Sequence, residues 1–204
     1  MESDDYLAIN RANWDSRVPH HEKGYDLDRF QDPSHLSETV RFDLPRLGDI
    51  AGKRAIHLQC HIGTDTLSLQ RLGAQVTGLD FSTPALEVAR RLARDIGADA
   101  EFVEADVYSA FDVLPRHAFD LVYTGIGALC WLPSAKRWAE IVAGLLKPGG
   151  ELFIREGHPM LWSMCDPRPD GLVTLDYPYF ETLGEDFVEQ FSYVAHDEPL
   201  GSPS

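Results

Sequence analysis

Short apolar runs alternate with segments of helical periodicity through the middle of the chain. The five runs expected to form strands are 55–58, 75–79, 100–103, 119–124 and 152–154. Between them, apolar residues recur at intervals of three and four, as on one face of a helix. This alternation predicts an α/β fold with a doubly wound, mostly parallel sheet that has its first strand near the centre.

Capping residues separate the helical segments from the strands. Ser82 or Thr83 can cap a helix with Pro84 near its first position, and Gly97 is a natural stop for that helix. Ser134 can cap a second helix, which the Lys-Pro-Gly-Gly sequence at 147–150 ends. These boundaries agree with the strand positions and strengthen the prediction of helices on both faces of the sheet.

The whole chain, 1–204, is expected to form a single domain with three parts. Residues 1–50 are mostly helical and rich in aromatic side chains, and we expect them to form a helical lid over the sheet. Residues 51–160 carry the predicted strands and form the core that binds the ligand. Residues 161–204 are rich in proline, aspartate and aromatic residues, and are an insertion or an incomplete C-terminal part.

Charge and composition narrow the choice of partners and compartment. The chain contains 18 Lys and Arg against 33 Asp and Glu, a net charge of −15, so no nucleic-acid partner is expected. No apolar run approaches the ~18 residues of a membrane span, and the acidic N-terminus does not resemble a signal peptide. The three cysteines, Cys60, Cys130 and Cys165, form no Cys-x-x-Cys motif, which suits a reducing compartment. We therefore expect a cytoplasmic protein without a membrane partner.

Acidic residues follow two of the predicted strands, at the edge of the sheet where α/β proteins bind ligands. Asp80 ends the second strand, where a carboxylate can accept hydrogen bonds from two ribose hydroxyls. Asp106 follows the third strand and could accept from an adenine amine, with the Val107 amide donating to a ring nitrogen. Each acid alone could equally be a solvated residue or a helix cap. Together they favour an adenosyl ligand.

The glycine content of the turn after the first strand helps to distinguish a dinucleotide from an adenosyl compound without phosphates. It contains Gly63 but lacks the Gly-x-Gly-x-x-Gly pattern that lets a pyrophosphate approach a helix N-terminus. A dinucleotide is thereby disfavoured, and an adenosyl cofactor without phosphates fits better.

At these positions the sequence resembles the S-adenosylmethionine-dependent methyltransferases with a Rossmann-like fold. The resemblance covers roughly residues 50–160. It rests on motifs in the same order, namely 56–66, Val76-Thr77-Gly78-Leu79-Asp80-Phe81-Ser82, Asp106, Phe119-Asp120-Leu121-Val122 and Leu146-Lys147-Pro148-Gly149-Gly150. The Asn-Trp-Asp-Ser-Arg stretch at 13–17 is similar to the N-terminal helix that covers the cofactor in some small-molecule methyltransferases. The resemblance implies methyl transfer from S-adenosylmethionine to a small-molecule acceptor.

The first motif departs from the usual family pattern. His57 stands in place of an acid, and Gln59 and His61 stand in place of glycines, whereas Gly63 is retained. The Gln59 carbonyl oxygen could accept from the methionine ammonium, and neutral His61 could contact the methionine carboxylate or shape the loop. The full set of expected cofactor-binding residues is Trp14, Tyr25, Gln59, His61, Gly63, Asp80, Phe81, Asp106, Val107 and Thr124.

Other side chains are candidates for the chemistry. Trp14, Tyr25 and Trp131 could form aromatic walls beside a sulfonium cation, or could simply pack in the core. The candidate acid or base groups are His20, His21, Glu156 and His158. His158 ranks first as the catalytic residue because it follows the fifth strand, and a base is needed only if the acceptor arrives protonated.

A metal site is not expected at His57, Cys60 and His61. Strand alternation sends neighbouring side chains to opposite faces, and no fourth ligand follows at a regular spacing. His57 is expected to be buried and hydrogen-bonded, and Cys60 to be a small packed residue.

Two rival functions share the predicted fold. An NAD(P)-dependent oxidoreductase would use the same acid after the second strand, but the missing glycine pattern and the preceding lid count against it. A non-catalytic adenosyl-binding module is the other alternative, because fold alone does not establish function. The acceptor atom and the oligomeric state cannot be read from the sequence.

The end of the chain is shorter than the family pattern implies, since related methyltransferases add two further strands after the fifth. Strands are possible at 172–175 and 187–194. We expect either that the sequence is an incomplete version of a longer protein, or that residues 172–194 close the edge of the sheet.

Overall fold

The computed structural model describes residues 5–165, 168–180 and 191–200, and its centre is a five-stranded sheet. The strands are β1 (Arg54–Leu58), β2 (Gln75–Asp80), β3 (Glu101–Glu104), β4 (Phe119–Thr124) and β5 (Leu146–Ile154). Their order is β3-β2-β1-β4-β5, and every neighbouring pair is parallel. This confirms the predicted doubly wound sheet with the first strand at its centre.

The fifth strand begins earlier than the sequence pattern indicates. Leu146 already pairs with Phe119, and regular pairing with β4 resumes at Glu151 after a shift in register. The Lys-Pro-Gly-Gly sequence at 147–150 therefore does end the preceding helix, as predicted, but it does so inside an irregular strand rather than in a separate turn.

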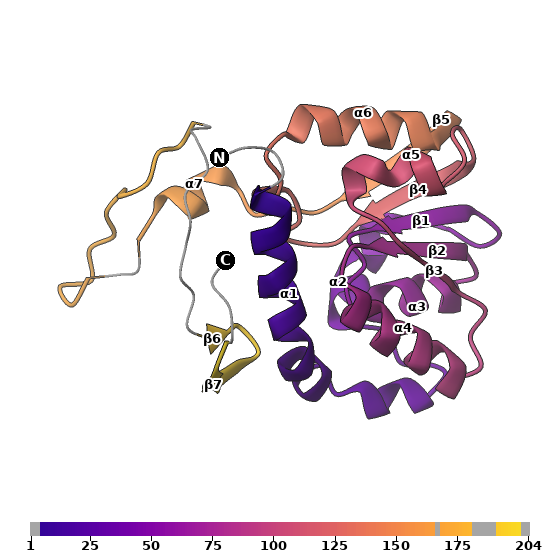
Figure 1. Ribbon diagram of the computed structural model, residues 1–204, viewed down its shortest axis with the longest axis horizontal. Coiled ribbons are helices and arrows are strands. Elements are labelled where there is room, and N and C mark those ends of the chain that lie inside the picture. Colours follow the sequence, from indigo (N-terminus) through magenta and orange to yellow (C-terminus); the bar gives the residue numbers. More distant parts are fainter. Residues whose placement is uncertain (1–4, 166–167, 181–190, 201–204) are drawn as a thin grey trace.

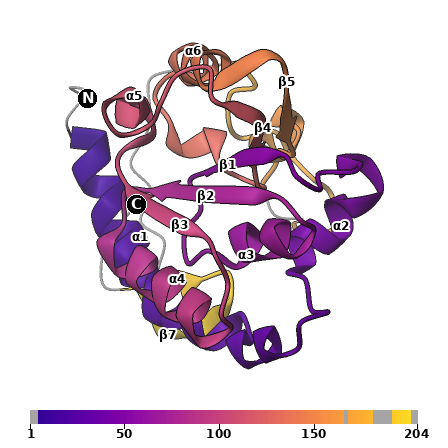
Figure 2. The same cartoon turned by 90° about the vertical axis from the view of Figure 1, so that its right-hand side faces the viewer.

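Helices cover both faces of the sheet and one of its ends (Figure 1). One face carries α5 (Ala110–Val113) and α6 (Ala135–Leu145), and the other carries α2 (Glu38–Leu47), α3 (Thr64–Arg71) and α4 (Thr83–Asp95). Figure 2 shows these two helical layers on opposite sides of the strands. Shorter elements are η1 (Leu27–Gln31), η2 (Val107–Ser109), η3 (Leu129–Trp131) and α7 (Pro159–Ser163).

The helices begin at the predicted capping residues. The Ser82 hydroxyl accepts from the Ala85 amide at 3.3 Å, and the Ser134 hydroxyl accepts from the Arg137 amide at 3.2 Å. Each such cap typically stabilises a helix by about 1 kcal/mol, because it satisfies an amide that has no partner within the helix.

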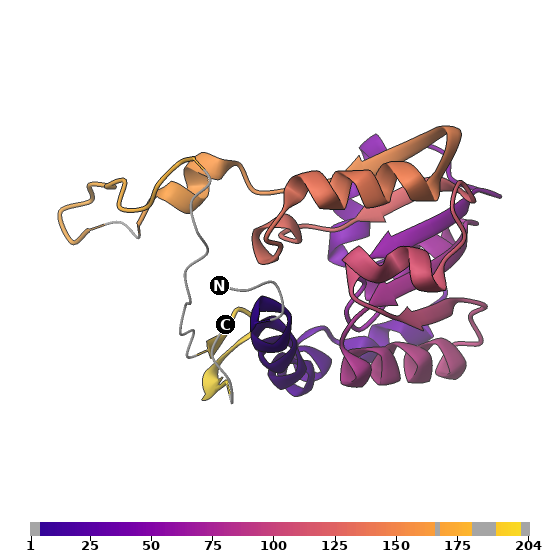
Figure 3. The ribbon, with the colours of Figure 1, turned by 45° about the horizontal axis from the view of Figure 1, so that its top comes forward.

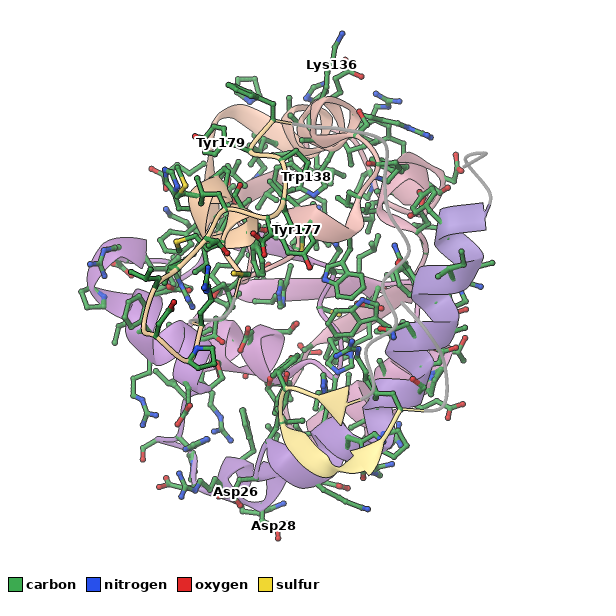
Figure 4. The ribbon with its side chains drawn as sticks, turned by 90° about the vertical axis from the view of Figure 1, so that its left-hand side faces the viewer. Asp26, Asp28, Lys136, Trp138, Tyr177 and Tyr179 are labelled. Atoms are coloured by element: carbon green, nitrogen blue, oxygen red, sulfur yellow. The ribbon has the colours of Figure 1, made fainter. Side chains whose placement is uncertain are left out.

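Alternate residues of β1 face opposite layers of the core. Ile56 and Leu58 are fully buried among residues of α5 and α6, including Trp138, which Figure 4 labels. Ala55 is buried on the other face, beside residues of α2 and α3. The central strand is thus fixed by apolar packing from both sides, which gives the carboxyl edge of the sheet a rigid base.

The helix α1 (Asp5–Gly24) lies across the end of the sheet rather than on either face (Figures 1 and 3). On its other side lies a small antiparallel hairpin of β6 (Phe191–Ser192) and β7 (Ala195–Pro199). Most of the described residues among the first 50 are helical, as predicted. In Figure 4, Asp26 and Asp28 project outward just beyond the end of α1.

The segment after β5 does not complete the sheet. Residues 172–175 were predicted as a strand, but only Leu175 pairs there, in an isolated bridge with Met164. This prediction is wrong, because α7 and residues 168–180 extend away from the core (Figure 1), and the carbonyls of Leu172 and Thr174 accept from Arg168 and Cys165 nearby instead of from a strand of the sheet. Tyr177 and Tyr179 lie on this segment (Figure 4) and are exposed.

The predicted strand at 187–194 lies partly outside the described residues. Within the described part, residues 191–192 pair with β7 and not with β5. The expectation that residues 172–194 close the sheet edge is therefore wrong for the described residues. None of the described helices combines the length and the apolar character needed to cross a membrane.

Candidate functional site

The loop after β1 keeps a glycine-like backbone at two positions that are not glycine. Gln59 and His61 have φ values of 57° and 49°, in the left-handed region that costs such residues about 1–2 kcal/mol. At Gly63, which has a φ of 78°, an added Cβ would come within 2.8 Å of Ala89 and Phe102. Gly63 is therefore required by packing. The strain at the other two positions points to a role for their side chains.

Two buried polar atoms at this edge have no hydrogen-bond partner in the described part of the chain. One is Oε1 of Gln59, directly after β1, and the other is Oγ1 of Thr124, the last residue of β4. The Gln59 amide is oriented by a hydrogen bond from Nε2 to the Ala128 carbonyl, at 3.2 Å. An unpaired buried polar atom costs about 1–3 kcal/mol. Because β1 and β4 are neighbours in the sheet, the two atoms mark one place that suits the polar groups of a ligand.

Asp80 lies at the end of β2 and is joined to the β1 loop. Its carboxylate accepts from the His61 amide at 2.8 Å and from the Ser82 amide at 2.9 Å. Burial raises the pKa of Asp80 to about 6, although these amides act in the opposite direction. A carboxylate with two such bonds still has lone pairs to offer, so the predicted contact with a ribose remains possible.

Asp106 follows β3 and caps η2. Its carboxylate is partly buried and accepts from the Tyr108 amide at 3.1 Å. Burial raises the pKa of Asp106, and backbone amides and Arg137 oppose that shift. The neighbouring Val107 is buried, and Phe81 is partly exposed beyond β2. The structure thus realises the capping role for Asp106, while its contact with an adenine stays a prediction.

Aromatic side chains from α1 and η3 meet beside the β1 loop. The Trp14 ring lies 5.1 Å from that of His61 and 5.2 Å from that of Trp131, measured between centroids. The fully buried Arg17 places its guanidinium over both tryptophan rings, at 5.6 and 5.7 Å. Trp14 and Trp131 thus pack together with Arg17, a residue that was not among the expected site residues, and their role as a wall beside a cofactor stays a prediction.

His21 and His61, called here the histidine pair, connect α1 to the β1 loop. Nδ1 of His21 lies 2.7 Å from Nε2 of His61, and Nε2 of His21 lies 2.8 Å from the Ser192 hydroxyl. Burial, followed by the charge of Arg17, lowers the pKa of His21 to about 4. Burial also holds the pKa of His61 below its ordinary value. Both rings are therefore neutral at pH 7.

Tyr25 contacts both His21 and the β6–β7 hairpin. Its ring stacks on His21 at a centroid distance of 5.0 Å, and its hydroxyl is hydrogen-bonded to the hydroxyl of Tyr193. Sequence reasoning placed Tyr25 near the site but missed Ser192 and Tyr193, because they lie about 170 residues away along the chain.

His57 and Cys60 are buried and packed among other side chains. His57 is buried and bonds through Nδ1 to the Thr66 hydroxyl at 2.8 Å, and burial lowers its pKa to about 3. Burial raises the pKa of the Cys60 thiol, which packs where a Cβ on Gly78 would fall. Across the described residues, no group of three His, Cys, Asp or Glu side chains is arranged to hold a metal ion.

Glu156, another acid or base candidate, accepts several backbone hydrogen bonds. Its carboxylate accepts from three successive amides, those of residues 127–129, at 3.1, 2.7 and 2.8 Å. His158 is exposed and caps α7 by accepting from the Met160 amide at 3.2 Å, and His20 is buried in α1. Glu156 therefore holds the loop that orients Gln59, and a catalytic role for His158 stays a prediction.

A second polar network lies on the α2 side of the same edge. The buried Asp43 accepts from the Tyr123 hydroxyl at 2.7 Å and from Arg155 Nε at 2.6 Å. Nearby, burial raises the pKa of Asp65, at the start of α3, to about 6. Sequence reasoning missed these residues because each stands in an ordinary helix or strand pattern.

The parallel sheet with acids after β2 and β3, and with a helix across its carboxyl edge, has the architecture of the Rossmann-like methyltransferases. A family model described as a methyltransferase domain matches residues 56–152. Residues 56–152 therefore resemble a methyltransferase domain, and the fold is that of the Rossmann-like S-adenosylmethionine-dependent methyltransferases.

Curated relatives agree with this assignment. The chain is 35% identical over 131 residues to a ubiquinone biosynthesis O-methyltransferase of Photorhabdus laumondii, across 63% of this chain and 54% of the relative. It is 33% identical to a protein of the same name from Vibrio cholerae, across 63% of this chain and 53% of the relative. The chain thus spans about half the length of the curated relatives it matches.

Solved structures show the same fold. An S-adenosylmethionine-dependent methyltransferase from Mesorhizobium loti matches with a TM-score of 0.56 and 26% identity, over 66% of this chain and 61% of that one. A protein from Pyrococcus horikoshii matches with a TM-score of 0.54 and 20% identity, over 73% of this chain and 76% of that one. The second likeness supports the fold alone.

Proposed function

We propose that this chain binds S-adenosylmethionine and transfers its methyl group to a small-molecule acceptor. The observation that carries the proposal is the pair of buried, unpartnered polar atoms, Gln59 Oε1 and Thr124 Oγ1, beside Asp80. When bound, S-adenosylmethionine supplies an electrophilic methyl group on a positively charged sulfur. The protein's own task is then to bind, align and shield the two reactants.

The residues suggest an order of contacts along the carboxyl edge. Asp80 would accept from the ribose hydroxyls, and Asp106 with the Val107 amide would bind the adenine. Gln59 would accept from the methionine ammonium through Oε1, which is buried and otherwise unpaired. Thr124 Oγ1 would complete the polar contacts at the end of β4.

The relatives' names favour an oxygen acceptor. They describe O-methyltransferases, and the aromatic wall of Trp14 and Trp131 suits a planar, apolar acceptor body. We also propose a cytoplasmic location, because Cys60, Cys130 and Cys165, all within the described residues, form no disulfide.

The oxidoreductase alternative is disfavoured by the β1 loop. Gln59 and His61 keep the left-handed backbone of the glycine positions but carry side chains, whereas a pyrophosphate needs bare backbone there. Calorimetry with S-adenosylhomocysteine, NAD and NADP is the direct test. We expect binding of S-adenosylhomocysteine only, and tighter binding of NAD or NADP would refute the proposal.

A non-catalytic adenosyl-binding module would pass that binding test. Transfer of a labelled methyl group from S-adenosylmethionine to a panel of phenols, amines and thiols separates the two functions. We expect turnover with at least one hydroxyl acceptor. The Asp80→Ala variant, which should bind the cofactor most weakly, is the impaired comparison, and Glu140→Gln, an exposed acid on α6, is the matched neutral control.

A further inference from the structure

The buried Ser192 hydroxyl fixes the position of the proton on His21. Its oxygen accepts from the Val194 amide at 3.4 Å, and Nε2 of His21 lies 2.8 Å from it. Within residues 5–165, 168–180 and 191–200, that nitrogen is the acceptor to which the hydroxyl donates. His21 is neutral because burial and Arg17 lower its pKa to about 4. Its single ring proton therefore lies on Nδ1.

The same order of protons continues to His61. Nδ1–H of His21 donates to Nε2 of His61 across 2.7 Å, since only one proton can lie between the two nitrogens. The neutral His61 ring then carries its proton on Nδ1. This N–H group has no hydrogen-bond partner in the part of the chain that the structure describes. The series Ser192, His21 and His61, called here the histidine relay, thus ends in an unused donor beside the β1 loop.

The His61 ring lies on the α1 side of the β1 loop. Its backbone amide donates to Asp80 on the side of the proposed ribose contact, whereas its ring packs 5.1 Å from the Trp14 ring. Trp14 lies against Trp131, and the Asn10 amide of α1 donates to the Trp131 carbonyl at 2.8 Å. The unused donor therefore lies beside the two tryptophan rings, where the acceptor is proposed to bind.

The charges around the histidine pair favour a negatively charged ligand. Burial lowers the pKa values of both rings most, and the charge of the buried Arg17 lowers both further. Among the described residues, no carboxylate contributes to these two shifts. Asp65 acts instead on the hydroxyls of Tyr25 and Tyr193, which stay neutral because burial raises their pKa values. A neutral N–H donor near a buried cation suits an anion.

We propose that the acceptor is a hydroxylated aromatic ring that also carries a carboxylate, and that the Nδ1–H group of His61 donates to that carboxylate. The inference rests on the proposed methyl transfer and names its substrate class. His21 and Ser192 are positioning residues, because they act through His61 by holding its proton on Nδ1. The charge of Arg17 attracts the anionic acceptor and opposes a protonated amine, which the positive sulfur of the cofactor also repels.

The first test locates the protons and does not depend on activity. Nitrogen-15 NMR of the full chain labelled at histidine distinguishes protonated from unprotonated ring nitrogens. At pH 7 we expect His21 and His61 to be protonated at Nδ1 and unprotonated at Nε2. In Ser192→Ala the constraint is lost, and we expect a mixture of tautomers in both rings. A wild-type His61 ring protonated at Nε2 would overturn the proposal, and unchanged tautomers in Ser192→Ala would remove Ser192 from it.

The second test measures acceptor binding to the protein saturated with S-adenosylhomocysteine. Calorimetry compares three catechols that differ in one substituent, namely 3,4-dihydroxybenzoate, which is negatively charged at pH 7, neutral catechol, and dopamine, which is positively charged. We expect dihydroxybenzoate to bind at least about tenfold tighter than catechol, as for a hydrogen bond to a charged group, and dopamine to bind most weakly. Equal affinities, tightest binding of dopamine, or no binding of dihydroxybenzoate would overturn the proposal.

The His61→Gly variant removes the donor at a position whose φ of 49° suits glycine. We expect the preference for dihydroxybenzoate over catechol to fall below about threefold. Because this preference is a ratio within one variant, a general loosening of the site weakens both ligands and leaves it unchanged. A preference that persists would overturn the proposal. If His61→Gly instead loses only its preference for S-adenosylhomocysteine over the decarboxylated analogue, the donor serves the methionine carboxylate and the acceptor assignment is wrong.

A matched pair at the second histidine tests positioning. His21→Asn keeps an amide donor near the place of Nδ1, whereas His21→Phe keeps a ring without a donor. We expect the preference for dihydroxybenzoate over catechol to be at least about threefold larger in the Asn variant, and equal preferences would remove His21 from the scheme. A wild-type chain that binds no S-adenosylhomocysteine would instead refute the proposed function. One that binds it without preferring dihydroxybenzoate would refute only this inference.

Discussion

Two polar networks share the carboxyl edge of the sheet, and they differ in whether their hydrogen bonds are complete. Around Asp43, each carboxylate oxygen has a partner, supplied by Tyr123 or Arg155, and the network ties α2 to the ends of β4 and β5. Around Gln59, two buried atoms lack partners and two residues adopt left-handed backbone conformations. Proteins seldom leave buried polar groups unpaired without a purpose. The complete network around Asp43 therefore has a structural role, and the incomplete one around Gln59 is the proposed ligand site.

The largest expected effect is on the complete network. Asp43→Ala should lower the free energy of unfolding by about 3 kcal/mol, at the low end for breaking a buried ion pair, because Arg155 keeps a quarter of its side chain exposed. Urea unfolding measures this loss. Glu38→Ala on the same helix, which breaks an exposed pair with Arg41, should cost less than about 1 kcal/mol. Equal losses in the two variants would erase the distinction between the networks.

The next effect is on ligand binding. Losing a charge-assisted hydrogen-bond partner typically costs about 1.5–3 kcal/mol, so Asp80→Ala should weaken S-adenosylhomocysteine binding by ~10- to 150-fold in calorimetry. Asp80→Asn keeps the shape and one acceptor oxygen and should fall between the wild type and alanine. A folded Asp80→Ala protein with wild-type affinity would remove Asp80 from the ligand site.

Binding should also depend on pH through the same residue. Because the pKa of Asp80 is about 6, its carboxylate is lost below that pH, and the Kd for S-adenosylhomocysteine should rise up to about tenfold between pH 7 and pH 5. A carboxyl pKa raised in the folded state stabilises the fold as the pH falls, so the contribution of Asp80 itself would not mimic this loss by unfolding. The pH dependence should flatten in Asp80→Asn, and a dependence that persists there would assign it to another group.

A smaller effect tests how the Gln59 side chain is held in place. The Glu156 carboxylate holds the loop whose Ala128 carbonyl orients the Gln59 amide. Glu156→Gln should weaken S-adenosylhomocysteine binding about fivefold, near 1 kcal/mol. In a Gln59→Leu background the same change should have little further effect, because the oriented group is already absent. Additive losses in this double-mutant cycle would show that Glu156 does not act through Gln59.

The smallest expected effect is that of Thr124→Val, which should raise stability but weaken ligand binding. Thr124→Val removes an unpaired buried hydroxyl with little change of shape, so the free energy of unfolding should rise by about 1 kcal/mol. Affinity for S-adenosylhomocysteine should fall about threefold in the same variant. A variant that gained stability without losing affinity would show that Thr124 makes no contact with the ligand.

Deleting residues 1–30 would test the predicted lid, but it would also disturb the core. Val18 and Phe30 are buried against the core, so removal of residues 1–30 would expose apolar surface as well as open the site. Trp14→Ala tests the lid with less disturbance, since Trp14 lies against His61 and Trp131.

The parallel sheet, the central place of its first strand and several helix boundaries could be predicted from the sequence. Apolar alternation and capping residues such as Ser82 and Ser134 are local signals, and local signals decide local structure. The segment 172–175 shows the limit of that reasoning. Its apolar residues fit a strand, but a strand also needs a neighbour to bond with, and α7 carries this segment away from the sheet.

The sequence by itself also determined which residues reach the carboxyl edge, because Gln59, Asp80 and Thr124 each stand directly at the end of a parallel strand. Tertiary structure alone decided which of their atoms are left unpaired, and that His21 and Ser192 approach His61. Strand ends are set by neighbours in the chain. Hydrogen bonds between residues as far apart as 21 and 192 depend on how α1 and the hairpin pack, which no local pattern encodes.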